Sequence, residues 1–192
     1  MTDCIEQAAI HRQRAADLLG GKWEQPLLAA QLEELPAVLA AHRAFRTRYQ
    51  EYFATPDAAE AAFFVLEELT EAANALCLND GRFTRNGDGR HKAQPGDALL
   101  ELAELFLMLD TLYGYAPPLV EYWQQVADRL DVEPGSLETL GRMVCGAVQA
   151  VLDPQIERPA RLARITLSMA YILTWPDFDV AHCRTVLDKW TH

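Results

Sequence analysis

The sequence lacks the features that mark secreted and membrane-spanning proteins. Its 192 residues include only four cysteines, which are widely spaced and form no CxxC pair, so no disulfide framework is expected. The N-terminus has no basic segment followed by an apolar core, as a signal peptide would. The longest apolar stretch, residues 98–113, contains three acidic residues and is too short to cross a bilayer. These absences predict a soluble, cytoplasmic protein that does not enter a membrane.

Positive charge is also scarce. The chain has 17 lysines and arginines against 28 aspartates and glutamates, which gives a formal net charge of −11. Such a surface repels the phosphate backbone of DNA and RNA, so a nucleic-acid polymer is not an expected partner. A single nucleotide is still compatible with this charge, because a bound divalent cation reverses its sign locally.

The pattern along the chain is helical. No run of alternating β-branched residues is present, helix formers dominate, and glycine and proline fall mostly in clusters. We therefore predict an all-α fold, an antiparallel bundle of helices that forms a single domain over residues 1–192. Asp57 and Asp97 are the predicted caps of two of these helices. The predicted helices cover residues 3–18, 26–33, 35–53, 57–77, 97–114, 118–131, 135–152, 159–174 and 178–190.

A weak internal similarity leaves two alternatives for the second half of the chain. Residues 65–76 and 140–151 share their apolar spacing, and the helices that follow them match roughly in length and order. One interpretation is a degenerate helical repeat at about 135–190 that has lost the acidic residues of the first copy. The other is that any two amphipathic helical hairpins look alike.

Two carboxylates stand inside an otherwise apolar helix. Ten of the twelve residues of segment 98–109 are apolar, and they surround the predicted helix on every side, which is typical of a buried helix. Glu101 and Glu104 are three residues apart and therefore share one face. A carboxylate removed from water without a partner costs several kcal/mol. No lysine or arginine occurs from 93 to 127, so the partner must come from elsewhere.

The preceding helix carries further acids on partly apolar faces, namely Glu67, Glu68 and Glu71. Acids that face each other across a helical hairpin repel unless a positive charge lies between them. Ligation by oxygen alone suits Mg²⁺ or Mn²⁺ better than zinc. Neither helix contains histidine, so the ligands of a ferritin-like di-iron bundle are missing. The sequence thus favours a metal-binding hairpin at about 57–114; the alternatives are a solvated charged face and salt bridges between helices.

The motif formed by residues 67–71 (EELTE) and 101–104 (ELAE) resembles the EExxE…ExxD signature of the MazG-like and dimeric dUTPase-like all-α nucleotide pyrophosphohydrolases. The resemblance is specific over about 61–115. It implies hydrolysis of a nucleoside triphosphate to a monophosphate and pyrophosphate, a nucleotide diphosphatase activity used in nucleotide-pool housecleaning. It also implies Mg²⁺, which Mn²⁺ can replace, and Glu67 and Glu68 as catalytic residues. The implied metal ligands are Glu68, Glu71, Glu101 and Glu104.

Two departures from the family pattern bear on activity. The last acid is Glu104 where the family usually has aspartate, and the stretch between the two motif halves is long. The alternatives are therefore a catalytically weak or inactive module that binds nucleotide or metal, and a protein–protein scaffold. The resemblance further implies a homodimer, or a single-chain pseudo-dimer if the internal repeat is real.

Basic residues gather in the segment that joins the two motif halves. In a chain this acidic, their concentration between residues 78 and 96 is unusual. We interpret them as candidates for a clamp on the triphosphate of the substrate, and the alternative is a charged, solvated loop. The candidate substrate-binding residues are Arg82, Arg85, Arg90 and Lys92.

Overall fold

The computed structural model describes residues 26–49, 57–79, 97–113 and 135–191. All regular structure in these ranges is helical, which confirms the all-α prediction, and the described residues contain no strand. The predicted helices over 3–18 and 118–131 lie outside the described residues. The helices are α2 (Pro26–Arg48), α3 (Ala58–Asn79), α4 (Ala98–Tyr113), α6 (Leu137–Leu152), α7 (Arg158–Leu173) and α8 (Val180–Thr191).

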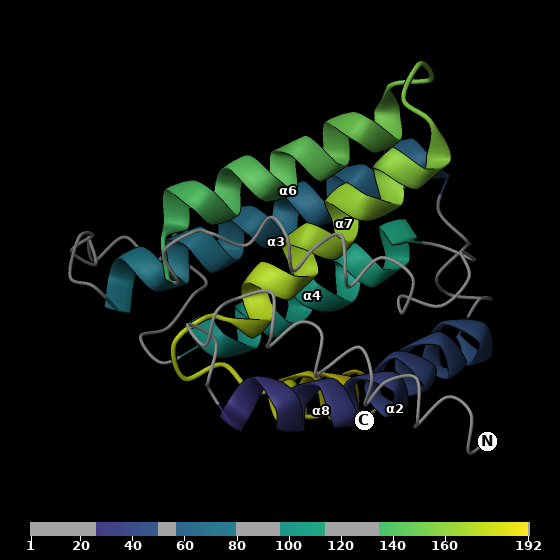
Figure 1. The fold of residues 1–192 in the computed structure, drawn as a ribbon. Coiled ribbons are helices and arrows are strands. Elements are labelled where there is room, and N and C mark those ends of the chain that lie inside the picture. The colour runs from purple at the N-terminus through teal and green to yellow at the C-terminus, as the bar shows by residue number, and fades with distance from the viewer. Residues whose placement is uncertain (1–25, 50–56, 80–96, 114–134, 192) are drawn as a thin grey trace, which may run out of the picture.

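The helices form a bundle with α4 at its centre. Helices that follow one another pack as pairs, α3 with α4 and α6 with α7, and α3 also packs against α6. On its other sides α4 contacts α7, α8 and α2, while α2 and α8 lie against each other (Figure 1). The two pairs are compatible with an internal repeat, which stays a prediction.

Helix α4 is enclosed along its length. None of residues 97–112 is exposed, and Leu102, Leu105 and Phe106 are fully buried. This confirms that the helix with apolar residues on every side lies in the interior. Any carboxylate on α4 is therefore held against protein rather than in open water.

Helix α2 corrects one prediction. We expected a break between helices at 26–33 and 35–53, because proline cannot donate the backbone hydrogen bond of a helix interior. The structure instead has one helix from Pro26 to Arg48 with Pro36 inside it. Leu35, Val38 and Leu39 are buried against the rest of the bundle. Packing along this face outweighs the local cost of the proline ring, which points to the surface side of the helix.

Helix α2 ends at Arg48, before the predicted end at residue 53, and residues 50–53 lie outside the described residues. The boundaries of α3, α4, α6, α7 and α8 agree with the predictions to within two residues. Asp57 caps α3 as predicted, because its Oδ1 accepts a hydrogen bond from the backbone N–H of Glu60 at 2.8 Å. Helix α4 begins directly after Asp97, whose carbonyl oxygen accepts from the N–H groups of Leu100 and Glu101 at 2.9 Å each. Local sequence signals thus fix where the two motif helices start.

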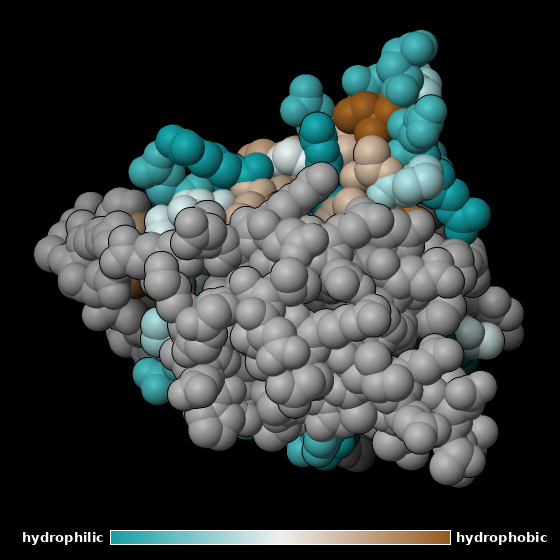
Figure 2. Space-filling model, viewed as in Figure 1, coloured by the Kyte–Doolittle hydropathy of each residue, from teal (hydrophilic) through white to brown (hydrophobic). Residues whose placement is uncertain are grey.

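The described surface in Figure 2 is mostly hydrophilic where α6 and α7 reach it, with smaller apolar areas between the charged side chains. Among the described residues, no helix has both the length and the apolar character that a bilayer span requires. The large apolar side chains that are exposed in the described ranges are Phe63 and Phe64 near the start of α3 and Leu152 at the end of α6.

Candidate metal centre

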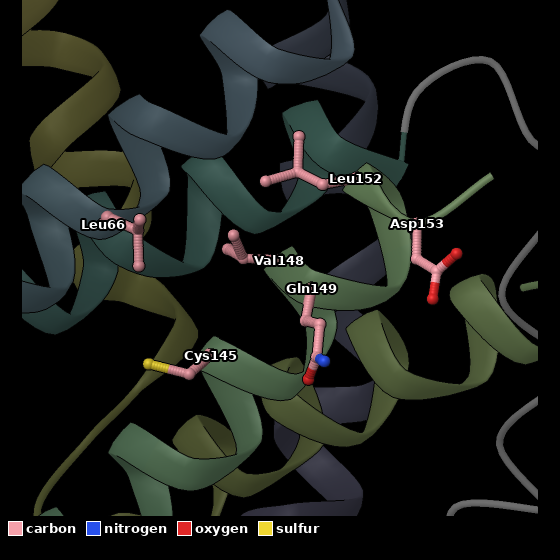
Figure 3. Close-up of a pocket in the computed structure, with 6 residues that line it drawn as sticks. All are labelled: Leu66, Cys145, Val148, Gln149, Leu152 and Asp153. Carbon is pink, nitrogen blue, oxygen red and sulfur yellow. The ribbon is translucent and has the colours of Figure 1, made fainter. Parts of the chain in front are cut away.

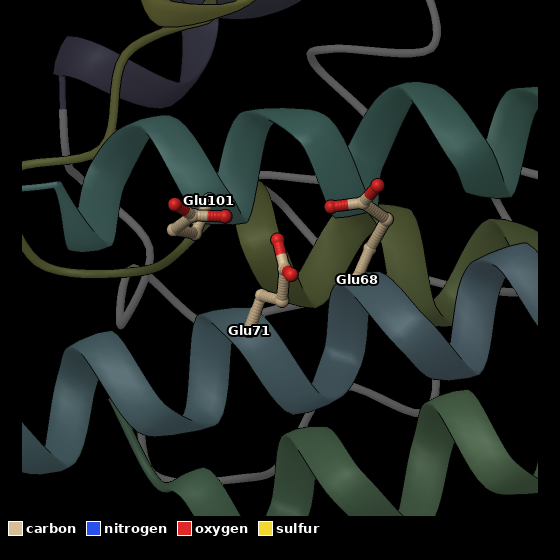
Figure 4. A group of neighbouring side chains, drawn as sticks. All are labelled: Glu68, Glu71 and Glu101. Carbon is tan, nitrogen blue, oxygen red and sulfur yellow. The ribbon is translucent and has the colours of Figure 1, made fainter. Parts of the chain in front are cut away.

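Three glutamates meet where α3 and α4 pack together. Glu68 and Glu71 come from α3 and Glu101 comes from α4, and each places a carboxylate oxygen within 4.8 Å of those of the other two (Figure 4). The spacing of three residues keeps Glu68 and Glu71 on one face of their helix. All three side chains are partly buried. Three of the four predicted ligands therefore lie together, and we call this group the glutamate cluster.

Burial and mutual repulsion make two members of the cluster, Glu68 and Glu101, hard to ionise. Burial, followed by the charges of Glu104 and Glu71, raises the pKa of Glu68 from 4.5 to about 8. Burial, followed by the same two neighbours, raises the pKa of Glu101 from 4.5 to about 7. The strongest neighbour of Glu68 on the other helix is Glu104, and that of Glu101 is Glu71. This crossed pairing is what two helices running in opposite directions produce.

Two oxygens of the cluster have no partner. One carboxylate oxygen of Glu68 and one of Glu101 are buried, and neither has a hydrogen-bond partner among the described residues. Buried polar atoms are almost always paired, so an unpaired carboxylate oxygen requires a proton or a cation. Within the described ranges, no lysine or arginine forms an ion pair with a member of the cluster. Several carboxylate oxygens and no nitrogen or sulfur fit a hard cation such as Mg²⁺ or Mn²⁺.

Glu104, the fourth predicted ligand, lies beside the cluster but outside the group of three. Its Oε1 is 3.4 Å from Nζ of Lys189 in α8, which packs against α4. The side chain of Glu104 is mostly buried, and that of Lys189 is mostly exposed. Sequence reasoning did not identify Lys189, because 85 residues separate it from Glu104 and no local pattern connects the two.

The remaining predicted site residues are placed differently. Glu67 is exposed and is not part of the group of three, although it is adjacent to Glu68 in α3. Its predicted catalytic role, at the solvent side of the cluster, stays a prediction. The predicted phosphate clamp of Arg82, Arg85, Arg90 and Lys92 lies outside the described residues.

A second polar group, also missed from the sequence, is buried between α2 and α4. Nδ1 of His42 is 2.8 Å from Oδ2 of Asp110, and Nη2 of Arg43 donates to Oδ1 of Asp110 at 2.9 Å. His42 and Asp110 are almost fully buried. Both oxygens of Asp110 thus have a partner, in contrast to the cluster, so this group serves to hold α2 against α4. The feature of the sequence that could have indicated this group is Asp110, an acidic residue within the apolar helix α4.

A hollow of about 470 Å³ lies between α3 and the C-terminal half of α6 (Figure 3). None of the clustered glutamates lines it, so it is not the metal centre. Its lining is mainly apolar and consists of Leu66, Cys145, Val148, Gln149, Leu152 and Asp153.

The candidate metal centre rests on the spacing of the acids in the sequence and on their arrangement in the structure. The motif halves at 67–71 and 101–104 lie on helices that pack together, and three of their five acids, Glu68, Glu71 and Glu101, meet at one point. Comparison of the chain with protein-family models, curated proteins and solved structures finds no match.

Proposed function

We propose that this protein is a Mg²⁺-dependent nucleoside triphosphate pyrophosphohydrolase, with Mn²⁺ able to replace Mg²⁺. The observation that carries the proposal is the pair of buried oxygens on Glu68 and Glu101 that have no partner within a cluster of three carboxylates. The motif resemblance adds the class of reaction. A purely structural ion-pair network would pair these oxygens with basic side chains, and a solvated acidic face would expose them to water; neither explains buried oxygens without a partner.

The residues fit the cation as follows. Glu68, Glu71 and Glu101 would hold it, and Glu104 would join them after leaving Lys189. Bound Mg²⁺ supplies a positive charge that offsets the triphosphate and lowers the pKa of a water molecule. Glu68 and Glu101 would bind the cation as carboxylates, without the protons that repulsion and burial favour in its absence.

The chain's own residues then handle the proton and the phosphates. Glu67, exposed beside Glu68, would accept a proton from the water that attacks the α-phosphorus of the substrate. The bond between the α-phosphorus and its bridging oxygen breaks, and pyrophosphate leaves with that oxygen. The proposal assigns the binding of the triphosphate to the basic residues Arg82, Arg85, Arg90 and Lys92. A homodimer or a single-chain pseudo-dimer belongs to the same proposal, and sedimentation analysis tests it.

The decisive experiment is a turnover screen. Natural and modified ribo- and deoxyribonucleoside triphosphates are incubated with the protein and Mg²⁺ or Mn²⁺, and pyrophosphate release is followed over time. Glu68→Gln and Glu101→Gln should each lower turnover by about 100-fold or more, since each removes a ligand. Glu60→Gln is the matched control, because Glu60 is exposed on the same helix and outside the cluster. The absence of turnover over the whole panel would reject catalysis.

One observation favours an alternative, a module that binds metal or nucleotide without turning it over. Glu104 is paired with Lys189 instead of joining the three glutamates. This alternative predicts that Mg²⁺ and nucleotide raise the melting temperature while no product forms, because a ligand stabilises whichever state binds it. A scaffold whose acids serve only structure would show no shift with Mg²⁺.

A further inference from the structure

Helix α8 places the ammonium group of Lys189 beside Glu104, the predicted ligand next to the glutamate cluster. Nζ of Lys189 lies 3.4 Å from Oε1 of Glu104, and 69% of the lysine side chain is exposed. Its charge also reaches the cluster, since it lowers the pKa of Glu101 against the upward effects of burial and of the neighbouring acids. Within the described residues, this is the one ion pair made by an acid of the two motif helices other than Asp110.

The lysine head group can move without moving its helix. Val186 and Leu187 are buried, and the ring of Trp190 lies 6.4 Å from that of His42 and 5.7 Å from that of Phe45. These contacts hold the last turn of α8 against α2. The exposed lysine stem is free to rotate, so breaking the ion pair costs little packing. The position of the charge is therefore adjustable while its anchor stays fixed.

Glu104 cannot bind both the ammonium group of Lys189 and a divalent metal ion without weakening one of the two interactions. If it turns to a divalent ion bound by the other glutamates, the ammonium group is left next to a positive centre and is repelled. A phosphate chain bound to that ion would offer the displaced ammonium group negatively charged oxygens in place of Glu104. A lysine ammonium is a compact donor with three hydrogens, suited to phosphate oxygens.

We propose that Lys189 is the counter-ion of Glu104 in the metal-free protein and moves to the phosphate chain of the ligand when Glu104 turns to the cation. The inference rests on the proposed metal centre and extends it to a residue outside the motif helices. Lys189 thus competes with the metal when no phosphate is present and aids phosphate binding once the metal is bound. The two effects have opposite signs, which a purely structural surface ion pair would not produce.

The test measures binding, not turnover. Mn²⁺ alone is titrated into the metal-free protein by calorimetry, and the Mn²⁺–pyrophosphate complex is then titrated into the Mn²⁺-saturated protein. For Lys189→Met we expect Mn²⁺ to bind about two- to fivefold more tightly, the range expected for an exposed ion pair. We expect pyrophosphate to bind at least about fivefold more weakly, because a charged hydrogen bond is lost. Lys189→Arg should remain near the wild type in both titrations.

Arg184→Met is the matched control. Arg184 is also exposed on α8 and pairs with an acid, but its partner is Glu34 of α2, at 3.1 Å. This variant removes the same charge from the same helix and should leave both affinities within about twofold of wild type. Any result for Lys189→Met other than the two opposite changes, or wild-type protein that binds no Mn²⁺, overturns the inference. Wild type that binds Mn²⁺ without turnover rejects the hydrolase and leaves this inference standing.

Discussion

Glu68 of α3 and Glu101 of α4 approach each other within the cluster, and in the described part of the chain each keeps one buried carboxylate oxygen without a partner. The two groups come from α3 and α4, the two helices that share the most extensive contact among the described residues, so the packing of these helices holds the two backbones close together. Such an arrangement opposes folding when both groups are ionised. Residues that destabilise the protein in this way are typical of binding sites.

The stability of the metal-free protein should fall as pH rises. The pKa of Glu68 is raised to about 8 and that of Glu101 to about 7, from 4.5 in the unfolded chain. Between about pH 4.5 and 8 the folded protein therefore binds more protons than the unfolded chain, and raising the pH favours unfolding. When a chelator keeps the protein free of metal ions, we expect the melting temperature to drop by several degrees from pH 5.5 to pH 8.5. The Glu68→Gln/Glu101→Gln variant should lose most of this drop, and a rise with pH would contradict the prediction.

Saturating Mg²⁺ should reverse that loss. The cation and the protons compete for the same carboxylates, so Mg²⁺ binds more tightly as pH rises through the raised pKa values of Glu68 and Glu101. At a concentration 100 times the dissociation constant, Mg²⁺ should stabilise the protein by about 2.7 kcal/mol at pH 8.5. Thermal unfolding with and without Mg²⁺ at several pH values measures the effect. Equal stabilisation at pH 5.5 and pH 8.5 would argue against binding by these carboxylates.

Neutralising Glu68 should make the metal-free protein more stable and at the same time abolish its response to Mg²⁺. Glu68→Gln removes a repelled, partly buried charge, so the metal-free protein at pH 8 should gain about 1 kcal/mol, a modest value because the site is partly solvated. The same variant should lose its response to Mg²⁺. Urea unfolding with and without Mg²⁺ measures both. Glu60→Gln, on the same helix, should keep the Mg²⁺ response, and a Glu68→Gln variant that is less stable than wild type would contradict this view.

Asp110 should matter for folding and not for metal binding. Asp110→Ala leaves His42 buried and removes the anion that Arg43 contacts, and breaking such a buried pair costs about 3–5 kcal/mol. Arg43→Met, which removes a partly exposed partner, should cost about 1 kcal/mol or less. Urea unfolding compares the two variants. If Asp110→Ala folds and has lost Mg²⁺ binding selectively, Asp110 belongs to the site instead.

Pro36 offers a substitution that should stabilise the protein. It lies inside α2, is exposed, and removes one backbone hydrogen bond from the helix. Pro36→Ala should raise the free energy of unfolding by about 2 kcal/mol, since proline costs about 3 kcal/mol in a helix and the more flexible unfolded chain offsets part of the gain. Chemical denaturation measures this. Pro36→Gly, which restores the N–H with a poor helix former, should give a smaller gain.

The sequence predicted the parts of the site that local chemistry determines. The caps at Asp57 and Asp97, the buried apolar helix and the convergence of Glu68, Glu71 and Glu101 all follow from periodicity and from the cost of an unpaired carboxylate. The pairs Glu104–Lys189 and His42–Asp110 join residues 85 and 68 positions apart, and no periodic pattern links them. The predicted break near Pro36 was wrong because tertiary packing of α2 outweighed the local preference of proline.

Because α4 is enclosed by other helices, we expect its backbone to open to solvent only rarely. The helix contacts α2, α3, α7 and α8, so its backbone amides become accessible to solvent deuterium only when these helices separate. Glu101 therefore stands on a segment that should exchange as slowly as the whole protein unfolds. Adaptation to different ligands must then come from side-chain rotation and from the elements around α4, not from motion of the helix itself.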